Sequence, residues 1–340
     1  MGKRSVVIDI GKFNTKICVF SLNGQKYSLQ NGAIFDTPND TMSDEFFQRC
    51  DIFLAKLNVA GSDLYVILGE NEENYTVTGN NKEIEKSVKE RYSALSKDGA
   101  NDCYYSWQTV GEPEATGQTR IMIAYAKKDY VDKMIKLAEK YKMKLMKVDL
   151  ASTAIDGMAR LMQKSPSIQS APPNTMFTLL DIGASSANLI FFTNNAVHRI
   201  VHFPHTIFKL DEALTGSSST VVYDKNLNRE AVKMIPELVT QVPQYELYTK
   251  PLLTNLIKEY ITTTDGGRKF ALGPIFVSGG LSKLPFFSQK LANDLRTQCF
   301  DFPIRDFVDI AENCIYRSNK KIYPTDDVFV TSLGTVAGGV

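Results

Sequence analysis

The strongest constraint on the fold is a short stretch that occurs twice in the chain. Residues 7–20 read VIDIGKFNTKICVF and residues 179–192 read LLDIGASSANLIFF. In each copy an apolar, β-rich run leads to Asp-x-Gly, then to a few mostly small or polar residues, and then to a second apolar run. This pattern predicts a tight β-hairpin. Because the copies lie about half a chain length apart, the sequence predicts two equivalent halves.

The tip of such a hairpin exposes backbone N–H groups and small side chains, which are the groups that surround a phosphate. Two hairpins that face each other across a pseudo-twofold axis could hold a phosphate chain between two similar domains. Asp9 and Asp181 would then each offer a carboxylate to a hydrated divalent ion. A single Asp-x-Gly is common and is also explained by a plain hairpin whose glycine has a positive φ. The duplication favours the phosphate interpretation.

Composition bounds the class of protein. The chain has 340 residues, 43% of them hydrophobic, and a net charge of +1, so it can bury a large core and most simply forms two domains. This balance disfavours disorder and a strongly basic nucleic-acid-binding protein. The five cysteines are scattered without a C-x-x-C motif, which indicates reduced thiols in a cytoplasmic protein. No apolar run reaches the length that a bilayer requires, so we expect no direct membrane insertion.

Periodicity gives a coarse map of the elements. We expect strands at 6–10, 16–20, 27–34 and 64–68, and an amphipathic helix that begins after Ser43 as its N-cap. Residues 79–146 differ from the flanking segments in composition and in their pattern of elements, which predicts an inserted α/β subdomain. Its aromatic residues Tyr104, Tyr105 and Trp107 favour core packing over a peptide-binding surface. Small residues on one face of the helix after Val148 predict that another helix packs closely against it. Small residues also occur on one face of 328–337, and we expect this segment to pack on the first domain.

The duplicated loops resemble the two phosphate motifs of the actin-like ATPase superfamily, and residues 275–283, IFVSGGLSK, are similar to its adenosine motif. The segments LLDIGASS, VDLASTAI, RIMIAYAKKDYVDKMI and VTSLGTVAGG resemble the PilM proteins of type IV pilus assembly in order and spacing. The related FtsA proteins also carry an extra subdomain at this place but usually end in a membrane-binding helix, so PilM is favoured.

The resemblance implies a fold and a division into domains. The fold class is α/β, with actin-like (ribonuclease H-like) duplicated domains and an inserted small α/β subdomain. The first domain would comprise residues 1–78, 147–172 and 318–340, the inserted subdomain 79–146, and the second domain 173–317.

The resemblance also implies a nucleotide site. Lys16 would reach the β and γ phosphates, Asp9 and Asp181 would hold Mg²⁺ through water, and Lys283 would lie at the pocket edge. The other expected contacts lie in three places. They are Gly11, Lys12, Asn14 and Thr15 in the first loop, Gly183, Ala184, Ser185 and Ser186 in the second loop, and Gly279, Gly280 and Leu281 in the turn beside the nucleoside. Lys12 and Phe13 depart from the small residues usual in PilM. No residue stands out as the group that positions water, so we expect ATP binding with weak or no hydrolysis.

By the same resemblance, the protein would be a cytoplasmic scaffold of a type IV pilus machine. A groove beside the insertion would hold the cytoplasmic tail of a PilN-like membrane protein, and pilus motor ATPases are further candidate partners. No nucleic acid is expected. The alternative is a filament-forming actin-like ATPase of the plasmid-segregation or cell-division type. A small-molecule kinase of this superfamily would need a catalytic Asp beside a sugar pocket, and no segment of the sequence presents one.

Overall fold

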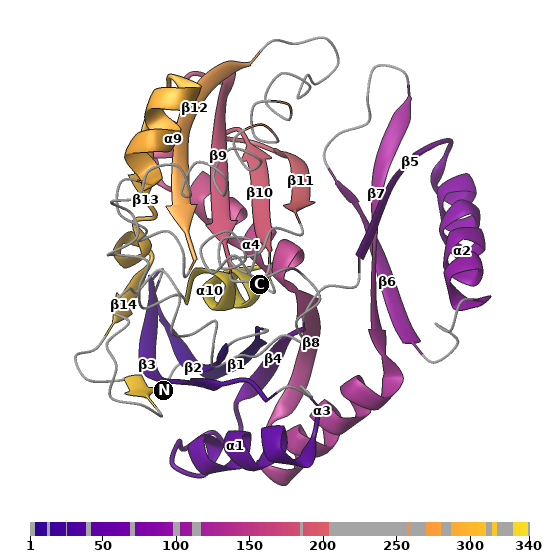
Figure 1. Ribbon diagram of the computed structural model, residues 1–340, viewed down its shortest axis with the longest axis vertical. Coiled ribbons are helices and arrows are strands. Elements are labelled where there is room, and N and C mark those ends of the chain that lie inside the picture. The colour runs from indigo at the N-terminus through magenta and orange to yellow at the C-terminus, as the bar shows by residue number, and fades with distance from the viewer. Residues whose placement is uncertain are drawn as a thin grey trace, which may run out of the picture.

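In the computed structural model the described residues are 4–11, 14–24, 26–38, 42–68, 72–97, 103–110, 117–183, 186–203, 254, 258, 270–279, 287–310, 315–317 and 329–338. They form three β-sheets with helices around and between them (Figure 1). None of the described helices is long and apolar enough to cross a membrane.

The first sheet has seven strands in the order β14-β3-β2-β1-β4-β8, with β15 also pairing with β3. The strands are β1 (Arg4–Ile10), β2 (Asn14–Asn23), β3 (Lys26–Asp36), β4 (Asp63–Leu68), β8 (Lys144–Leu150), β14 (Val308–Ile310) and β15 (Ile315–Arg317). Two helices, α1 (Asp44–Leu54) and α3 (Lys128–Lys140), pack on one face of this sheet. Helix α1 begins as predicted, because the Ser43 hydroxyl accepts a hydrogen bond from the Phe46 N–H.

The second sheet has five strands in the order β11-β10-β9-β12-β13. They are β9 (Thr175–Ile182), β10 (Ala187–Phe192), β11 (Val197–Phe203), β12 (Ala271–Ser278) and β13 (Cys299–Asp301). The short helix α5 (Pro166–Gln169) precedes this sheet. Helix α9 (Phe287–Leu295) and the 3-10 turn η2 (Ile304–Asp306) flank β13 along the chain.

The two sheets repeat one topology. In the first, β1, β2 and β3 form an antiparallel meander, and β4 and then β8 add in parallel on the other side of β1. In the second, β9, β10 and β11 form the same meander, and β12 and β13 add in parallel beside β9. The duplication predicted from the twin hairpins is therefore a duplication of whole sheets, and the predicted fold class is confirmed.

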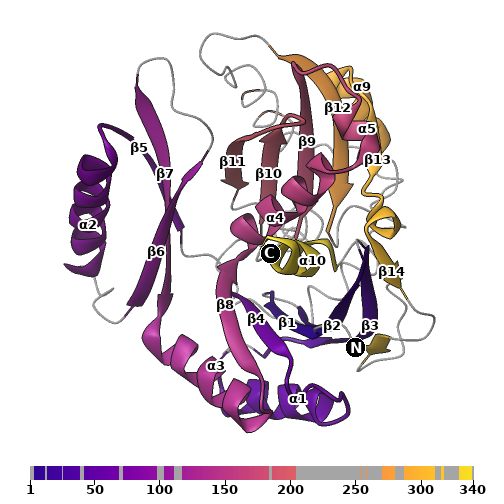
Figure 2. The ribbon, with the colours of Figure 1, turned by 180° about the vertical axis from the view of Figure 1, so that it is seen from behind.

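Two helices, α4 (Ala151–Gln163) and α10 (Val330–Ala337), lie between the two sheets (Figures 1 and 2). Their apolar side chains share one core with the inner faces of both sheets, to which Val7 and Phe20 contribute from one side and Leu179 and Ile190 from the other. The helices cross at Gly157 and Gly334, where an added Cβ on Gly157 would lie 2.1 Å from the Gly334 carbonyl oxygen. The close helix approach predicted from the small residues is thus present.

The third sheet belongs to the inserted subdomain, which stands beside the other two sheets (Figure 1). It has the order β5-β7-β6, from β5 (Glu72–Thr78), β6 (Cys103–Val110) and β7 (Gln118–Lys127). Helix α2 (Asn81–Lys97) covers one face through Ile84 and Val88, against which Trp107 packs. Trp107 thus packs, partly buried, against this core, but Tyr104 and Tyr105 are 49% and 42% exposed, so the core packing expected for all three aromatic residues is wrong for the two tyrosines. Near the start of β7, the Arg120 side chain donates a hydrogen bond to the His198 carbonyl of β11 at 3.2 Å, so this bond joins the third sheet to the second.

Three segments differ from the expected domain boundaries. Strand β5 pairs with β7 and so lies in the inserted sheet, although residues 1–78 were expected in the first domain. Helix α3 packs in the core of the first sheet, although 79–146 was expected as the insertion. Strands β14 and β15 pair with β3, although 173–317 was expected as the second domain. In each case the partners are distant in sequence, and local composition carries no signal of them.

Candidate functional site

The two predicted loops have the same construction. The first runs from Gly11 to Asn14 between β1 and β2, and the second from Gly183 to Ser186 between β9 and β10. The Gly11 N–H donates to the Asn14 carbonyl at 3.1 Å, and the Gly183 N–H donates to the Ser186 carbonyl at 2.8 Å. An added Cβ would lie 2.9 Å from that carbonyl oxygen at Gly11 and 3.1 Å at Gly183, which explains glycine in both places. The sequence match therefore corresponds to a match in hydrogen bonding.

The first loop is braced from β3 and the residues that follow it. The Thr37 hydroxyl donates to the Gly11 carbonyl at 2.7 Å and lies 2.8 Å from the hydroxyl of Thr15. Thr15 is fully buried, whereas Asn14 is exposed. Among the residues predicted to line the loop, Asn14 therefore lies at its surface, whereas Thr15 is buried beneath it.

A lysine and an aspartate face each other at the base of the first loop. Lys16 is the cross-strand partner of Asp9, and its Nζ lies 2.6 Å from Asp9 Oδ2. Burial alone would lower the pKa of Lys16, but the negative charge of Asp9, with a smaller contribution from Asp181, raises it above its ordinary value. Lys16 is therefore a permanent cation in a largely buried position.

The second aspartate is held differently. Asp181 is 7% exposed and accepts hydrogen bonds from the Ser278 hydroxyl at 2.9 Å and from the Thr331 hydroxyl at 3.4 Å. Burial raises the pKa of Asp181, while Lys16 and the Ser278 hydrogen bond act in the opposite direction. At the position of Lys16, the second hairpin has Asn188, so the cation belongs to the first hairpin alone.

One helix connects the two aspartates. Ser332, next to Thr331 in α10, donates to Asp9 Oδ2 at 3.4 Å. Carboxylates from two different sheets are thus bonded by adjacent residues of α10. The aspartates that precede the two predicted loops are therefore joined through this one helix.

A third carboxylate lies near this helix and was not identified from the sequence. Asp149, near the end of β8, is 3% exposed and forms an ion pair with Lys147 at 2.8 Å. It also accepts hydrogen bonds from Thr153 of α4 and Thr335 of α10. The segment VDLASTAI, which contains Asp149, predicts a closely packed helix and resembles PilM, but neither feature points to the carboxylate. Its contact with α10 could not be predicted, because Thr335 is 186 residues away from Asp149.

The third predicted motif lies beside the second loop. Gly279 follows β12 and has a φ of +90°, a conformation that favours glycine. An added Cβ would lie 2.4 Å from the Ile182 carbonyl oxygen, so the chain after β12 passes directly against the end of β9. Other predicted contacts lie outside the described residues: Lys12, Ala184, Ser185, Gly280, Leu281 and Lys283.

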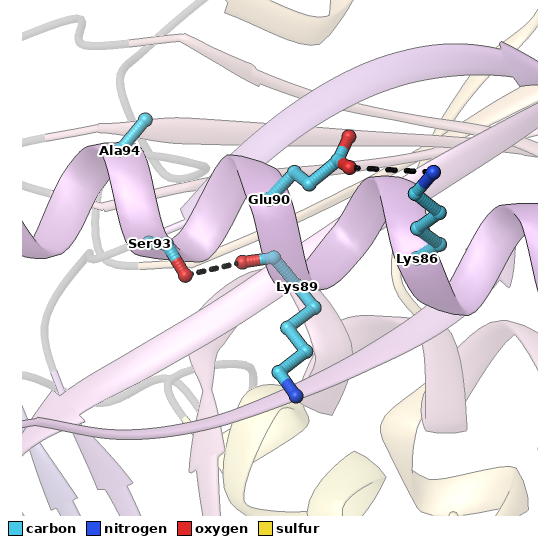
Figure 3. Close-up of a pocket in the computed structure, with 5 residues that line it drawn as sticks. All are labelled: Lys86, Lys89, Glu90, Ser93 and Ala94. Atoms are coloured by element: carbon cyan, nitrogen blue, oxygen red, sulfur yellow. Dashed lines mark hydrogen bonds and ion pairs between the residues drawn. The ribbon is translucent and has the colours of Figure 1, made fainter.

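A separate hollow lies on the exposed side of α2, lined by Lys86, Lys89, Glu90, Ser93 and Ala94 (Figure 3). Lys86 and Glu90 form an ion pair there at 3.9 Å, and the Ser93 hydroxyl donates to the Lys89 carbonyl at 2.7 Å. Its lining comes from one helix of the inserted subdomain. It contains none of the residues predicted for the nucleotide site.

This chain resembles known proteins in its three-dimensional structure. No protein-family model matches the chain, and no curated protein matches it in sequence. A solved chain titled PilM-PilN type IV pilus biogenesis complex is 16% identical, with a TM-score of 0.71, and the match covers 100% of this chain and 99% of that one.

Two further solved structures are more distant. The ethanolamine utilization protein EutJ from Carboxydothermus hydrogenoformans is 13% identical, with a TM-score of 0.49, and the match covers 99% of this chain and 90% of that one. MreB5 of Spiroplasma citri bound to ADP is 9% identical, with a TM-score of 0.47 and coverage of 98% and 95%. The match to the PilM-PilN chain, which covers both chains almost completely, shows that this chain has that chain's fold, the duplicated actin-like fold.

Proposed function

We propose that this protein binds ATP with Mg²⁺ between its two hairpin loops and serves as a cytoplasmic scaffold for the tail of a membrane-anchored, PilN-like protein. The observation that supports the nucleotide site best is the pair of equivalent loops. They have the same internal hydrogen bond, and their aspartates are bonded by adjacent residues of one helix.

The donor set fits a nucleoside triphosphate and a hard cation. Lys16 is a fixed positive charge on a flexible stem and is suited to the terminal phosphates. Asp9 and Asp181 offer carboxylate oxygens, the ligand type that Mg²⁺ prefers, and would hold the hydrated ion. The ion would offset charge on the phosphates, while the loop N–H groups and Lys16 bind and orient them.

We propose binding with weak or no hydrolysis. A residue that activates water needs to reach it with a free acceptor atom. Among the described residues, Asp149 is the additional carboxylate at α10, and it is already engaged by Lys147, Thr153 and Thr335. Its position is therefore better suited to holding α10 than to abstracting a proton.

The proposed partner surface is strand β6. Among the described strands it is hydrogen-bonded to β7 alone, on one side, and it also contacts β11 of the second sheet. Its sequence CYYSWQTV contains no charged residue and no proline, and Tyr104 and Tyr105 are 49% and 42% exposed. Edge strands usually carry charges or prolines that prevent pairing, so an edge without them is suited to accept an extended peptide as an added strand.

The choice of occupant follows from the structural likeness. One similar solved structure is a PilM-PilN complex, which supports an extended tail of a PilN-like protein as the peptide. Such a tail would place the protein at the inner face of the membrane through its partner.

Isothermal titration calorimetry tests both parts separately. We expect saturable binding of ATP in the presence of Mg²⁺, and saturable binding of a synthetic peptide with the sequence of the PilN-like tail from the same organism. Absence of ATP binding would remove the nucleotide part. Absence of peptide binding both with and without nucleotide would remove the scaffold part and leave the nucleotide part standing.

A further inference from the structure

Helix α10 carries three hydroxyls on a helix that is otherwise apolar and buried. Thr331, Ser332 and Thr335 are 6%, 0% and 0% exposed. Buried hydroxyls need hydrogen-bond partners, and each of these three has a different aspartate. Thr331 bonds Asp181 of β9, Ser332 bonds Asp9 of β1, and Thr335 bonds Asp149 of β8.

The helix is fixed against its neighbour. An added Cβ on Gly334 would lie 2.1 Å from the Ala154 carbonyl oxygen of α4, so the two backbones are already in contact. Interiors of this density do not deform continuously. The Thr331 and Ser332 hydroxyls are therefore held at set positions relative to the ends of β9 and β1.

We propose that Thr331 and Ser332 are positioning residues for the metal, because their hydroxyls set the direction of the two carboxylates that would hold Mg²⁺. This inference rests on the proposed nucleotide site and names residues that the actin-like motifs in the sequence did not include. A hydrogen bond to a carboxylate that holds a metal restricts its rotation and tunes its affinity. Because one helix supplies both bonds, it also fixes how the two carboxylates face each other.

The affinity for ATP should then have two separable contributions, one that depends on Mg²⁺ and one that does not. The carboxylates act on the phosphates through Mg²⁺, whereas Lys16 and the loop N–H groups act on them directly. Loss of a positioning hydroxyl should therefore reduce the gain in affinity that Mg²⁺ gives and leave the metal-free affinity unchanged. A general loosening of the fold would reduce both.

The test compares Thr331→Val, which removes the hydroxyl and keeps the shape, with Thr331→Ser, which keeps the hydroxyl. ATP affinity is measured by calorimetry with excess Mg²⁺ and again with EDTA. For Thr331→Val we expect the Mg²⁺-dependent gain to fall about tenfold, the low end of the range for residues that orient metal ligands. Thr331→Ser should retain the gain, and thermal unfolding monitored by circular dichroism verifies that each variant is folded.

Ser332→Ala, which creates no new bulk, repeats the test on the other carboxylate and replaces Thr331→Val if that variant does not fold. The positioning role is overturned if Thr331→Val keeps the full gain, if both affinities fall equally, or if Thr331→Ser behaves like Thr331→Val. Failure of the wild-type chain to bind ATP in either buffer would instead overturn the proposed function itself.

Discussion

Lys16 Nζ lies 2.6 Å from Asp9 Oδ2, directly across the first hairpin, and the equivalent pair in the second hairpin is Asn188 with Asp181. The duplicated halves therefore share their loops and their aspartates but differ in charge. In the proposed site, the first half would supply the cation for a terminal phosphate. The second half has an aspartate held by neutral hydroxyls, and a single triphosphate would meet these two unlike ends.

Lys16→Met should weaken ATP binding strongly. A hydrogen bond to a charged group contributes about 1.5–3 kcal/mol, which corresponds to roughly a 10- to 150-fold loss in affinity. Calorimetry with MgATP measures the loss. Lys26→Met is the matched control, because Lys26 also pairs with an aspartate at 2.6 Å in the same sheet but is 41% exposed. Equal affinities of both variants would contradict the role of Lys16.

Asp181→Asn should stabilise the fold at neutral pH while weakening Mg²⁺-dependent ATP binding. Burial raises the pKa of Asp181, so its carboxylate binds a proton more tightly in the folded chain than in the unfolded chain. The ionised carboxylate therefore costs stability above its folded pKa, and the cost disappears as the pH falls below the ordinary value of 3.8. The stabilisation by Asn should be largest near pH 7 and shrink in acid, measured by urea unfolding across this range.

Asp156→Asn is the control for that variant. Burial also raises the pKa of Asp156, which lies in α4 and pairs with Arg160 at 2.8 Å. We expect a pH-dependent change in stability of the same sign but unchanged ATP affinity. If Asp156→Asn weakened ATP binding as much as Asp181→Asn, the loss would reflect the fold and not the metal.

Gly157→Ala should destabilise the protein by about 3 kcal/mol, the upper end of the range for overpacking, because the new Cβ would meet the Gly334 carbonyl at 2.1 Å. Urea unfolding followed by circular dichroism gives the value. Gly61→Ala separates the cost of an unfavourable backbone conformation from the cost of a steric clash. A Cβ there meets nothing within 4 Å, but the φ of +74° should cost about 1–2 kcal/mol. A smaller effect at Gly157 than at Gly61 would contradict the close packing of α4 and α10.

Tyr104→Ala should lower the affinity for the PilN-like tail peptide by about tenfold, as expected for loss of an aromatic contact at an interface. The ring is half exposed on β6, with Lys128 Nζ 6.0 Å from its centroid. Fluorescence anisotropy of a labelled peptide measures the change. Leu272→Ala is the control, because Leu272 is 52% exposed on β12 of the second sheet. Unchanged affinity in Tyr104→Ala would remove β6 as the docking strand.

The sequence allowed the fold to be predicted, together with the place of Asp9, Lys16 and Asp181 in the two hairpins, because these features are local. The twin Asp-x-Gly runs gave both hairpins, and the small residues of 328–337 predicted a packed helix. Thr331 and Ser332 were not predicted as site residues, because their partners are 150 and 323 residues away and a hydroxyl in an apolar helix is usually a packing detail. Ser278 was missed in the same way beside the recognised Gly279. Strand β5 was not predicted, because the polar residues of EENYTVT do not alternate clearly with apolar ones. Strand β6 was not predicted either, although CYYSWQTV contains aromatic and β-branched residues that are typical of strands.

A crystal structure of the protein soaked with Mg²⁺ and a non-hydrolysable ATP analogue tests the central claim most directly. We predict the triphosphate between the Gly11–Asn14 and Gly183–Ser186 loops, with Lys16 on its terminal phosphates and the metal facing Asp9 and Asp181. The analogue bound elsewhere, or absent from between these loops at saturating concentration, would contradict the account.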